Sequence, residues 1–299
     1  MQKLLARGLI SVHTLSYNKY RPAIAGKGEQ MKYKLITSDF DNTIFDGERV
    51  SPRVLKAIAD YRRAGGRFVV ATGRVFESIR PRVPEIGADD EVIACQGGAI
   101  YKASTCEVLD RFPLTPEIAM KAVRYYEKRG AVCHAYLDRE FYVAEKNPLS
   151  EKYADFCCVR PTYLGRPLSS FLPEMPVTNK IIAILDEGEI DDALTELAAL
   201  LGPEAEVTKS SPIFLEVTSA QAGKGNCLVA LARRLGIPIE ETVAVGDNLN
   251  DLSMVRAAGL GVSVGNGVPQ LKDAADLVVP PITEDGVADL IDRIINDEL

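Results

Sequence analysis

The chain has 299 residues, of which 46% are hydrophobic and 26% are charged, and its formal net charge is −7. That length supplies enough apolar material for one large domain or two ordinary ones. The acidic balance argues against a nucleic-acid-binding surface, which normally shows clustered Lys and Arg, although a small phosphorylated substrate needs only a local positive site. No apolar run reaches membrane-spanning length, so we expect neither nucleic acid nor a membrane as a partner.

Residues 1–30 differ in character from the rest of the chain. They carry five Lys or Arg residues against one Glu, and their apolar residues are scattered. The segment is as basic as a transit peptide, but it lacks the continuous apolar stretch of a secretory signal. Because the sequence from Met31 reads as the natural start of a folded domain, we interpret 1–30 as the product of an upstream start codon or as a poorly ordered extension.

From Met31 the chain alternates short β-branched runs with amphipathic helices. Residues 34–38 read KLITS and residues 67–72 read RFVVAT, and both runs are typical of strands buried on two faces of a sheet. Between them, Ser51 and Pro52 predict a helix start, with an N-cap followed by Pro at the first helical position. The glycines at 65–66 predict the end of that helix.

The segment 112–218 has a different pattern. It contains a helix predicted from Thr115–Pro116 to Gly130 and a second near 188–201. Runs typical of strands, some at hairpin spacing, stand beside a Pro-rich stretch predicted as a loop over 160–176; these runs are 131–137, 140–145, 179–185 and 212–218. Strands and helices mixed in this way predict an α+β module inserted into the first fold.

The first pattern returns after residue 218. A helix is predicted from Lys224 to Leu235, ending at Gly236, and strands are predicted at 242–246, 261–265 and 276–280. Residues 31–111 and 219–299 together therefore predict an α/β core with a doubly wound, Rossmann-like parallel sheet. In such a core, ligands bind at the carboxyl ends of the strands.

Polar residues stand at the predicted strand ends. Asp39 and Asp41 follow the first strand and share one face of the extended chain, with Thr43 beyond them. The second strand ends at Thr72 and Gly73, a hydroxyl donor followed by a residue that lets the backbone approach a ligand closely. Lys224 begins a helix, where free N–H groups already favour an anion. The strand at 242–246 is followed by Asp247, Asn250 and Asp251.

This set of side chains favours a hard divalent cation and a phosphate. Clustered carboxylates raise one another's pKa unless a cation intervenes, and oxygen ligands without His or Cys favour Mg²⁺. Thr43, Thr72 and Lys224 can then hold phosphate oxygens. An aspartate is a competent nucleophile toward phosphorus, and a second carboxylate two residues on can serve as general acid and base.

In order and spacing these residues resemble the four motifs of the haloacid dehalogenase-like (HAD) phosphatases. The motif residues are Asp39, Asp41, Thr43, Thr72, Lys224, Asp247, Asn250 and Asp251. The insert resembles the α/β cap of the Cof-type subgroup, and so do the segments 95–101, 261–268 and 274–291. The similarity covers essentially all of residues 31–299.

The resemblance implies a role for each acidic residue. Asp39 would be the nucleophile and a Mg²⁺ ligand. Asp41 would be the general acid and base and would coordinate the metal through its backbone carbonyl. Asp247 would be the second carboxylate on the metal, and Asp251 would support the metal's water shell or Lys224.

The resemblance also implies a phosphate site. Thr72 and Lys224 would bind the phosphoryl group, and Lys224 would in addition neutralise Asp39. Asn250 and Asn266 lie where family members contact the phosphate or the surroundings of the metal. Thr43 and Gly73 complete the predicted substrate-binding set.

Three positions depart from the pattern of the family. Asn42 replaces a common glycine, although Asn tolerates left-handed geometry, so that the turn can survive. Gln96-Gly97-Gly98 stands where Asn-Gly-Ala is usual, which leaves the role of Gln96 open. Val264 takes a place often held by Met or Ala, a difference that we interpret as packing.

Other readings of single features are weaker than the joint pattern. A calcium loop starting at Asp39 fails because its sixth position is Ile44 and its twelfth is Val50. A P-loop at Lys224 fails because the earlier Gly would be Thr218 and Gly225 stands where Ser or Thr is needed. We interpret Asp46 as loop polarity. His134 and Tyr136 in the insert are interpreted as packing residues, with substrate contact as the alternative.

The six cysteines do not predict a metal site, since none forms a C-x-x-C pair and the chain has two histidines. The adjacent Cys157 and Cys158 could form a strained redox disulfide, but two thiols in a reducing cytosol are the simpler interpretation. We accordingly expect a cytoplasmic protein, monomeric or homodimeric.

The sequence thus predicts a Mg²⁺-dependent phosphatase for small phosphomonoesters, such as sugar phosphates, that works through an aspartyl-phosphate. A phosphomutase or phosphotransferase with the same intermediate, and a non-catalytic metabolite-binding protein, are the alternatives. We also expect the inserted module to close over the strand ends and to select the substrate.

Overall fold

The computed structural model describes residues 31–175 and 177–299. The prediction for residues 1–30 lies outside this range. Among the described helices, none is long and apolar enough to cross a membrane.

The first sheet lies where the α/β core was predicted, and its strand order is β14-β13-β12-β1-β2-β3-β4-β5. Parallel pairing runs from β14 to β3, while β4 and β5 add an antiparallel edge that the sequence did not predict. The strands are β1 (Leu35–Ser38), β2 (Arg67–Ala71), β3 (Glu91–Ala94), β4 (Ala99–Lys102), β5 (Val108–Arg111), β12 (Thr242–Gly246), β13 (Leu260–Val264) and β14 (Leu277–Val279).

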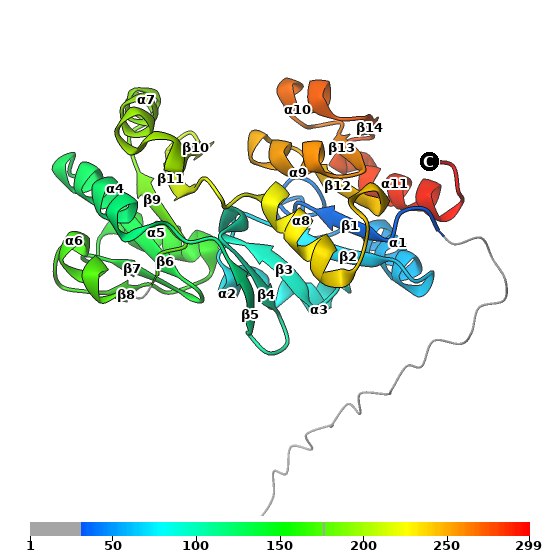
Figure 1. The fold of residues 1–299 in the computed structure, drawn as a ribbon, viewed down its shortest axis with the longest axis horizontal. Helices are drawn as coiled ribbons and strands as arrows, with labels where there is room; N and C mark the ends of the chain where they lie inside the picture. The colour runs from blue at the N-terminus through cyan, green and yellow to red at the C-terminus, as the bar shows by residue number, and fades with distance from the viewer. Residues whose placement is uncertain (1–30, 176) are drawn as a thin grey trace, which may run out of the picture. The chain divides into compact units, whose positions relative to one another are not determined.

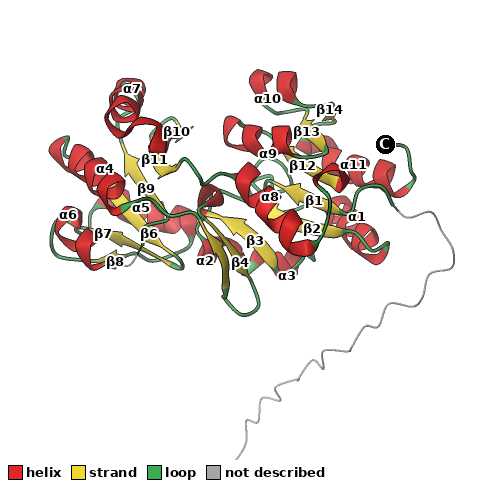
Figure 2. Ribbon diagram, viewed as in Figure 1, coloured by secondary structure: helices red, strands yellow, loops and turns green. Residues whose placement is uncertain are grey.

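Helices cover both faces of this sheet, as Figures 1 and 2 show. Ile36 belongs to a buried cluster with α1 (Pro52–Arg63) and α11 (Gly286–Ile295), whereas its neighbour Leu35 packs with α8 (Lys224–Leu235) and α9 (Leu252–Ala257). Because successive strand residues point to opposite faces, this division confirms the doubly wound arrangement. Shorter helices flank the sheet: α2 (Phe76–Ile79), α3 (Arg82–Ile86) and α10 (Pro269–Ala274).

The predicted capping signals act as expected. The Ser51 hydroxyl accepts a hydrogen bond from the Val54 N–H at 3.1 Å, and Pro52 opens α1. Helix α8 ends at Gly236, whose φ of 68° lies in the left-handed region that glycine adopts without strain. Both helices of the core that the sequence predicted are therefore confirmed.

The second sheet, in the order β10-β11-β9-β6-β7-β8, is built from the inserted segment, and all its pairings except β7 with β8 are antiparallel. We call residues 112–218 the cap segment; its status as a separate domain stays a prediction. Its strands are β6 (Val132–Leu137), β7 (Glu140–Val143), β8 (Thr162–Tyr163), β9 (Lys180–Ile184), β10 (Ala205–Ser211) and β11 (Phe214–Ser219).

Helices α4 (Pro116–Lys128) and α7 (Ile190–Leu201) pack on one face of the second sheet, and α5 (Pro148–Cys157) contributes to the buried cluster on the other. The loop prediction for 160–176 was wrong, because β8, α6 (Leu168–Phe171) and a 3₁₀ turn (Leu172–Glu174) lie there. The sequence also missed α5 and β10, and β11 begins two residues later than expected.

Polar contacts join the cap segment to the first sheet near the strand ends. Arg111 on β5 forms an ion pair with Asp138 in the β6–β7 turn, at 2.5 Å. The Tyr101 hydroxyl donates to the Asp138 carbonyl at 3.3 Å and accepts from the Asn179 Nδ2 at 3.2 Å. The cap sheet consequently lies beside the edge of the core sheet that carries the predicted chemistry.

Candidate active site

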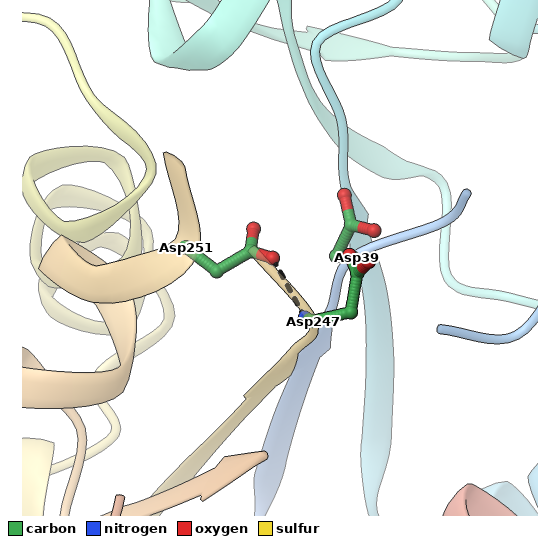
Figure 3. A group of neighbouring side chains, drawn as sticks. All are labelled: Asp39, Asp247 and Asp251. Carbon is green, nitrogen blue, oxygen red and sulfur yellow. Dashed lines mark hydrogen bonds between the residues drawn. The ribbon is translucent and has the colours of Figure 1, made fainter. Parts of the chain in front are cut away.

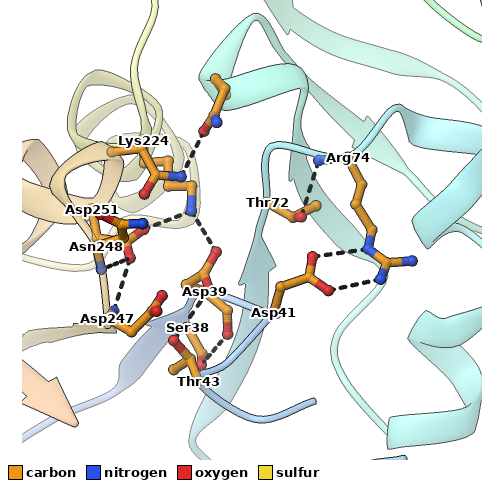
Figure 4. Close-up of polar contacts among 12 residues, drawn as sticks. Ser38, Asp39, Asp41, Thr43, Thr72, Arg74, Lys224, Asp247, Asn248 and Asp251 are labelled. Carbon is orange, nitrogen blue, oxygen red and sulfur yellow. Dashed lines mark hydrogen bonds and ion pairs between the residues drawn. The ribbon is translucent and has the colours of Figure 1, made fainter. Parts of the chain in front are cut away.

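Asp39 lies at the carboxyl end of β1, and its backbone N–H continues the ladder to the Val245 carbonyl of β12 at 2.9 Å. Its carboxylate is buried and receives two hydrogen bonds. Lys224 Nζ donates to Oδ1 at 2.5 Å, and the Thr43 hydroxyl donates to Oδ2 at 3.1 Å (Figure 4). The predicted proximity of these three residues is therefore present.

Lys224 is the first residue of α8, and its side chain is fully buried. The Nζ atom also donates to Asp251 Oδ1 at 2.6 Å. Gly223, which precedes it, has a φ of 123°, a conformation that L side chains rarely adopt, and this turn aims Lys224 inward. Gly97 packs against that turn, since a Cβ there would lie 2.3 Å from the Gly223 carbonyl carbon.

Asp251 holds the loop after β12. Its Oδ2 accepts the backbone N–H groups of Asp247 at 2.9 Å and Asn248 at 3.1 Å, while its Oδ1 accepts from Lys224 (Figures 3 and 4). Both carboxylate oxygens of Asp251 are thus engaged with the protein. This geometry matches the implied support of Lys224 and fixes the position of Asp247.

Asp39, Asp247 and Asp251 form an acidic triad whose carboxylate oxygens lie within 4.8 Å of one another. Burial raises the pKa of Asp39 well above its ordinary value despite the charge of Lys224. Burial, with the charge of Asp251, raises the pKa of Asp247 to about 6. Three carboxylates face one ammonium group, so the site has unbalanced negative charge and oxygen donors, and this arrangement fits a divalent cation.

Asp41 points away from the triad toward a different partner. Its carboxylate forms a two-pronged ion pair with Arg74, with 2.7 Å from Nη2 to Oδ1 and 2.9 Å from Nε to Oδ2 (Figure 4). The guanidinium also stacks over the rings of Phe40 and Phe45, at 5.2 and 5.4 Å from their centroids. No role was predicted for Arg74, although its place directly after Thr72-Gly73 was an available signal.

Thr72 and Gly73 form the loop after β2. The Thr72 hydroxyl is buried and accepts the backbone N–H of Arg74 at 3.1 Å. A Cβ at Gly73 would lie 2.6 Å from Gln96 Nε2, so glycine permits the close approach of that side chain. Gln96 has a left-handed φ of 58°, and its Oε1 accepts from Asn250 Nδ2 at 3.0 Å. Gln96, whose role the sequence left open, therefore contacts Asn250, a predicted substrate-binding residue.

Asn42 adopts the left-handed conformation that was expected to replace glycine, with a φ of 58°. Asn266 stabilises this turn from outside, donating to the Asn42 carbonyl at 2.8 Å and accepting from the Ile282 N–H at 2.9 Å. Asn266 is exposed and does not line the cavity described next. The structure thus does not bring Asn266 to the site, because its side chain is occupied by two backbone groups.

A cavity of about 170 Å³ opens between the strand ends and the cap segment. The core contributes Asp39, Asp41, Asn42, Gly73, Arg74, Ser78, Gln96, Asp247, Asn248 and Asn250 to its walls. The cap segment contributes Tyr153, Cys157, Lys180, Ile182, Ser210, Phe214 and Glu216. Of these cap residues, Cys157 alone was singled out from the sequence, because strand alternation cannot tell which face of the cap sheet meets the core.

The remaining predictions fall outside the cavity. His134 and Tyr136 are buried among the rings of Phe141 and Tyr153, in agreement with the packing interpretation. Asp46 accepts two backbone N–H groups of its own turn, those of Glu48 and Arg49, as loop polarity implies.

Cys157 and Cys158 are free thiols, the first buried at the cavity wall and the second exposed. This state agrees with the simpler of the two cysteine interpretations.

Comparison with known proteins places this geometry in context. The chain matches the family of haloacid dehalogenase-like hydrolases over residues 36–291. It is 48% identical over 287 residues to the phosphatase YwpJ of Bacillus subtilis, covering 88% of this chain and 100% of that protein. It is 27% identical over 266 residues to the 5-amino-6-(5-phospho-D-ribitylamino)uracil phosphatase YcsE of Bacillus subtilis, covering 88% and 96%. A solved HAD subclass IIB sugar phosphatase aligns with a TM-score of 0.75 and 25% identity, covering 87% of this chain and 98% of that chain.

Proposed function

The chain belongs to the haloacid dehalogenase-like hydrolases and is a phosphatase, and from this membership we propose that it hydrolyses phosphomonoesters of small metabolites with Mg²⁺ as cofactor. The observation that carries the proposal is the position of Asp39. Its carboxylate lies at a strand end between Lys224 and Thr43, beside two further carboxylates and at the wall of a cavity. The sugar phosphatase and the uracil-derivative phosphatase among the similar proteins support a phosphorylated metabolite as substrate.

We assign the first chemical step to Asp39. An ionised Asp39 oxygen attacks phosphorus and forms an aspartyl-phosphate, while the bond to the leaving oxygen breaks. Lys224, at 2.5 Å from Oδ1, offsets negative charge on Asp39 and on the incoming phosphoryl group. Thr43 keeps the second oxygen of Asp39 in place, and Gly73 and Arg74 of the loop after β2 line the same cavity.

We assign the proton transfers to Asp41. Protonated Asp41 gives its proton to the leaving alkoxide, then takes one from the water that attacks the aspartyl-phosphate, so that phosphate and free Asp39 result. In the structure Arg74 binds both oxygens of the Asp41 carboxylate, so this ion pair opens before Asp41 exchanges a proton with the substrate or with water. Asp41 therefore serves in proton transfer rather than in the acidic triad.

Asp39 and Asp247, together with the backbone carbonyl of Asp41, would hold Mg²⁺, while Asp251 positions Asp247 and Lys224. When bound, the ion would offset the charge of the carboxylates and of the phosphoryl oxygens. The elevated pKa of buried Asp247 supports this assignment, because a buried carboxylate without a counter-charge favours its neutral form.

The alternatives remain a phosphomutase or phosphotransferase and a metabolite-binding protein without turnover. All use the same pocket, but they differ in product: a mutase yields isomers without free phosphate, and a binding protein yields neither. A cytoplasmic location and a monomeric or homodimeric state also remain predictions.

The test measures free phosphate released from a panel of phosphorylated metabolites in the presence of Mg²⁺. The wild type should release phosphate, and Asp39→Asn should lose turnover by several orders of magnitude. Asp46→Asn, an exposed aspartate in the same loop, is the matched control and should retain activity. Phosphate release by Asp39→Asn at the wild-type rate would refute the nucleophile assignment, and isomer formation without phosphate would favour the mutase.

A further inference from the structure

A buried ion pair of the cap segment faces the cavity from the side opposite Asp39. Lys180 on β9 and Glu216 on β11 have side chains that are 1% and 6% exposed, and their Nζ and Oε2 atoms lie 2.9 Å apart. Both residues line the cavity. Charged side chains are rarely buried unless they are paired, and burying such a pair brings little net stability, so this position calls for a functional reading.

The ammonium group of Lys180 already has protein partners in every direction. Nζ donates to the Gly73 carbonyl at 3.1 Å, which joins the cap segment to the loop after β2. It forms the ion pair with Glu216 Oε2 at 2.9 Å, and it stands 4.9 Å from the centre of the Tyr136 ring, which attracts the cation. Since an ammonium group has three donors, Lys180 has little capacity left for a ligand.

Glu216 has acceptor capacity that the protein does not use. Its Oε1 accepts from the Ser210 hydroxyl at 2.6 Å. Its Oε2 lies 2.9 Å from Lys180 Nζ in the ion pair. An ionised carboxylate offers about four acceptor sites, so Glu216 can still accept an N–H or O–H of a ligand beside Ser210 and Lys180.

The surroundings restrict what that ligand can be. The cavity of about 170 Å³ is smaller than the roughly 300–1,000 Å³ of pockets for drug-sized ligands, so the group it takes is compact. Ile182 and Phe214 supply apolar wall beside Glu216. The two cationic residues that line the cavity, Arg74 and Lys180, are already paired with Asp41 and Glu216. A carboxylate of the ligand would therefore be desolvated there without a counter-charge of its own, whereas a neutral hydroxyl needs none.

We propose that Glu216 is the specificity-determining residue for the leaving group and accepts a hydrogen bond from one of its hydroxyls. This inference rests on the proposed function. Lys180 holds Glu216 in place and links it to the loop after β2. The substrate class is the phosphomonoester of a small, neutral, polyhydroxylated alcohol, and phosphomonoesters of hydroxy acids are disfavoured.

The experiment uses substrates matched in shape. Glucose 6-phosphate is compared with cyclohexylmethyl phosphate, and glycerol 3-phosphate with propyl phosphate and with 3-phosphoglycerate. In each set the wild type should favour the neutral hydroxylated ester in kcat/KM by at least 10-fold. Glu216→Gln should reduce that preference by about 10- to 100-fold, the range for a hydrogen bond to a charged group. Glu174→Gln, in an exposed cap ion pair with Arg166, should leave the preference unchanged.

A second variant separates recognition from folding. Lys180→Met/Glu216→Leu removes both charges together, so no unpaired buried charge remains, and it too should lose the preference. Two results would overturn the inference: equal losses of kcat/KM on the hydroxylated and the plain esters, or a preference for the hydroxylated esters that survives in both variants. So would a wild type that favours the plain or the acidic esters. If the wild type released phosphate from none of these or any other phosphomonoester, the proposed function would fail instead.

Discussion

His134 offers a quantitative test of the cap interior. Its imidazole is fully buried on β6, and both ring nitrogens lack a hydrogen-bond partner among the described residues. The ring packs against Phe141 and Tyr153, at centroid distances of 5.3 and 4.7 Å. Burial, with a smaller contribution from the charge of Lys180, lowers the pKa of His134 to about 3. The folded protein therefore keeps this histidine neutral.

The sign of the pH effect follows from that pKa. Unfolded His134 has an ordinary pKa of about 6.5, so between pH 6.5 and 3 the unfolded chain binds a proton that the folded chain does not. The contribution of neutral His134 to the free energy of unfolding is complete above pH 6.5 and falls as the pH drops. Lowering the pH from 7.5 to 4.5 should cost about 2.7 kcal/mol from this residue, at 1.36 kcal/mol for each pH unit between 6.5 and 4.5.

His134→Phe removes the titration and the two unpartnered nitrogens while keeping an aromatic ring. The free energy of unfolding in urea should rise by about 1–3 kcal/mol at pH 7.5, because an unsatisfied buried polar group costs this much. The advantage over the wild type should grow by a further ~2.7 kcal/mol at pH 4.5.

Tyr136→Phe is the control for this measurement. It alters the same ring cluster, and burial raises the pKa of Tyr136 well above its ordinary value. Tyr136 therefore stays neutral across this pH range, and the change in the free energy of unfolding caused by Tyr136→Phe should be equal at pH 7.5 and pH 4.5. If the advantage of His134→Phe were the same at pH 7.5 and pH 4.5, the reasoning about the buried neutral imidazole would be refuted.

Three further predictions concern the core. Lys224→Met leaves Asp39 and Asp251 without their shared counter-charge, so urea unfolding of the metal-free protein should show a loss of about 3–5 kcal/mol; full retention of stability would contradict the buried ion pairs. Removal of divalent cations with EDTA should stop phosphate release and Mg²⁺ should restore it, with Asp247→Asn needing more Mg²⁺ for half-maximal activity; activity in EDTA would exclude the cofactor assignment. Asn42→Ala should lower the free energy of unfolding by about 1 kcal/mol because of its positive φ, whereas Asn42→Gly should not; equal effects would show that the turn relaxes.

The sequence predicted the core of the fold because its signals were redundant. The strand at 67–72, for example, is apolar, β-branched and placed between a capped helix and a Gly turn, and β2 lies there. The antiparallel β4 and β5 carry no such support, since each is four residues long and their pairing depends on the turn over 103–107, in which Cys106 has a left-handed φ of 61°. Helix α5 was missed although Asn147 and Ser150 form a capping box and Pro148 opens the helix.

The sequence predicted the part of the site that follows from the carboxyl ends of parallel strands meeting at one edge of the sheet. Asp39 and Asp247 follow neighbouring strands, β1 and β12, so topology alone brings them together. The direction of each side chain beyond that was not predictable. The Asp41 carboxylate binds Arg74 and the Asn266 side chain binds backbone groups, because each side chain finds hydrogen-bond partners in its own neighbourhood.

The cap side of the site shows the limit of sequence reasoning most clearly. In β9, Lys180, Ile182 and Ile184 point to one face and Ile181 and Ala183 to the other, and both faces are buried. A lysine at the start of such a strand normally predicts a solvent-exposed end. Only the pairing of β9 with β11, in which Ile182 lies opposite Glu216, places the two charges on the same face and turns that face toward Gly73. The pattern of one strand therefore cannot reveal a polar subsite that two strands and a loop of the core create together.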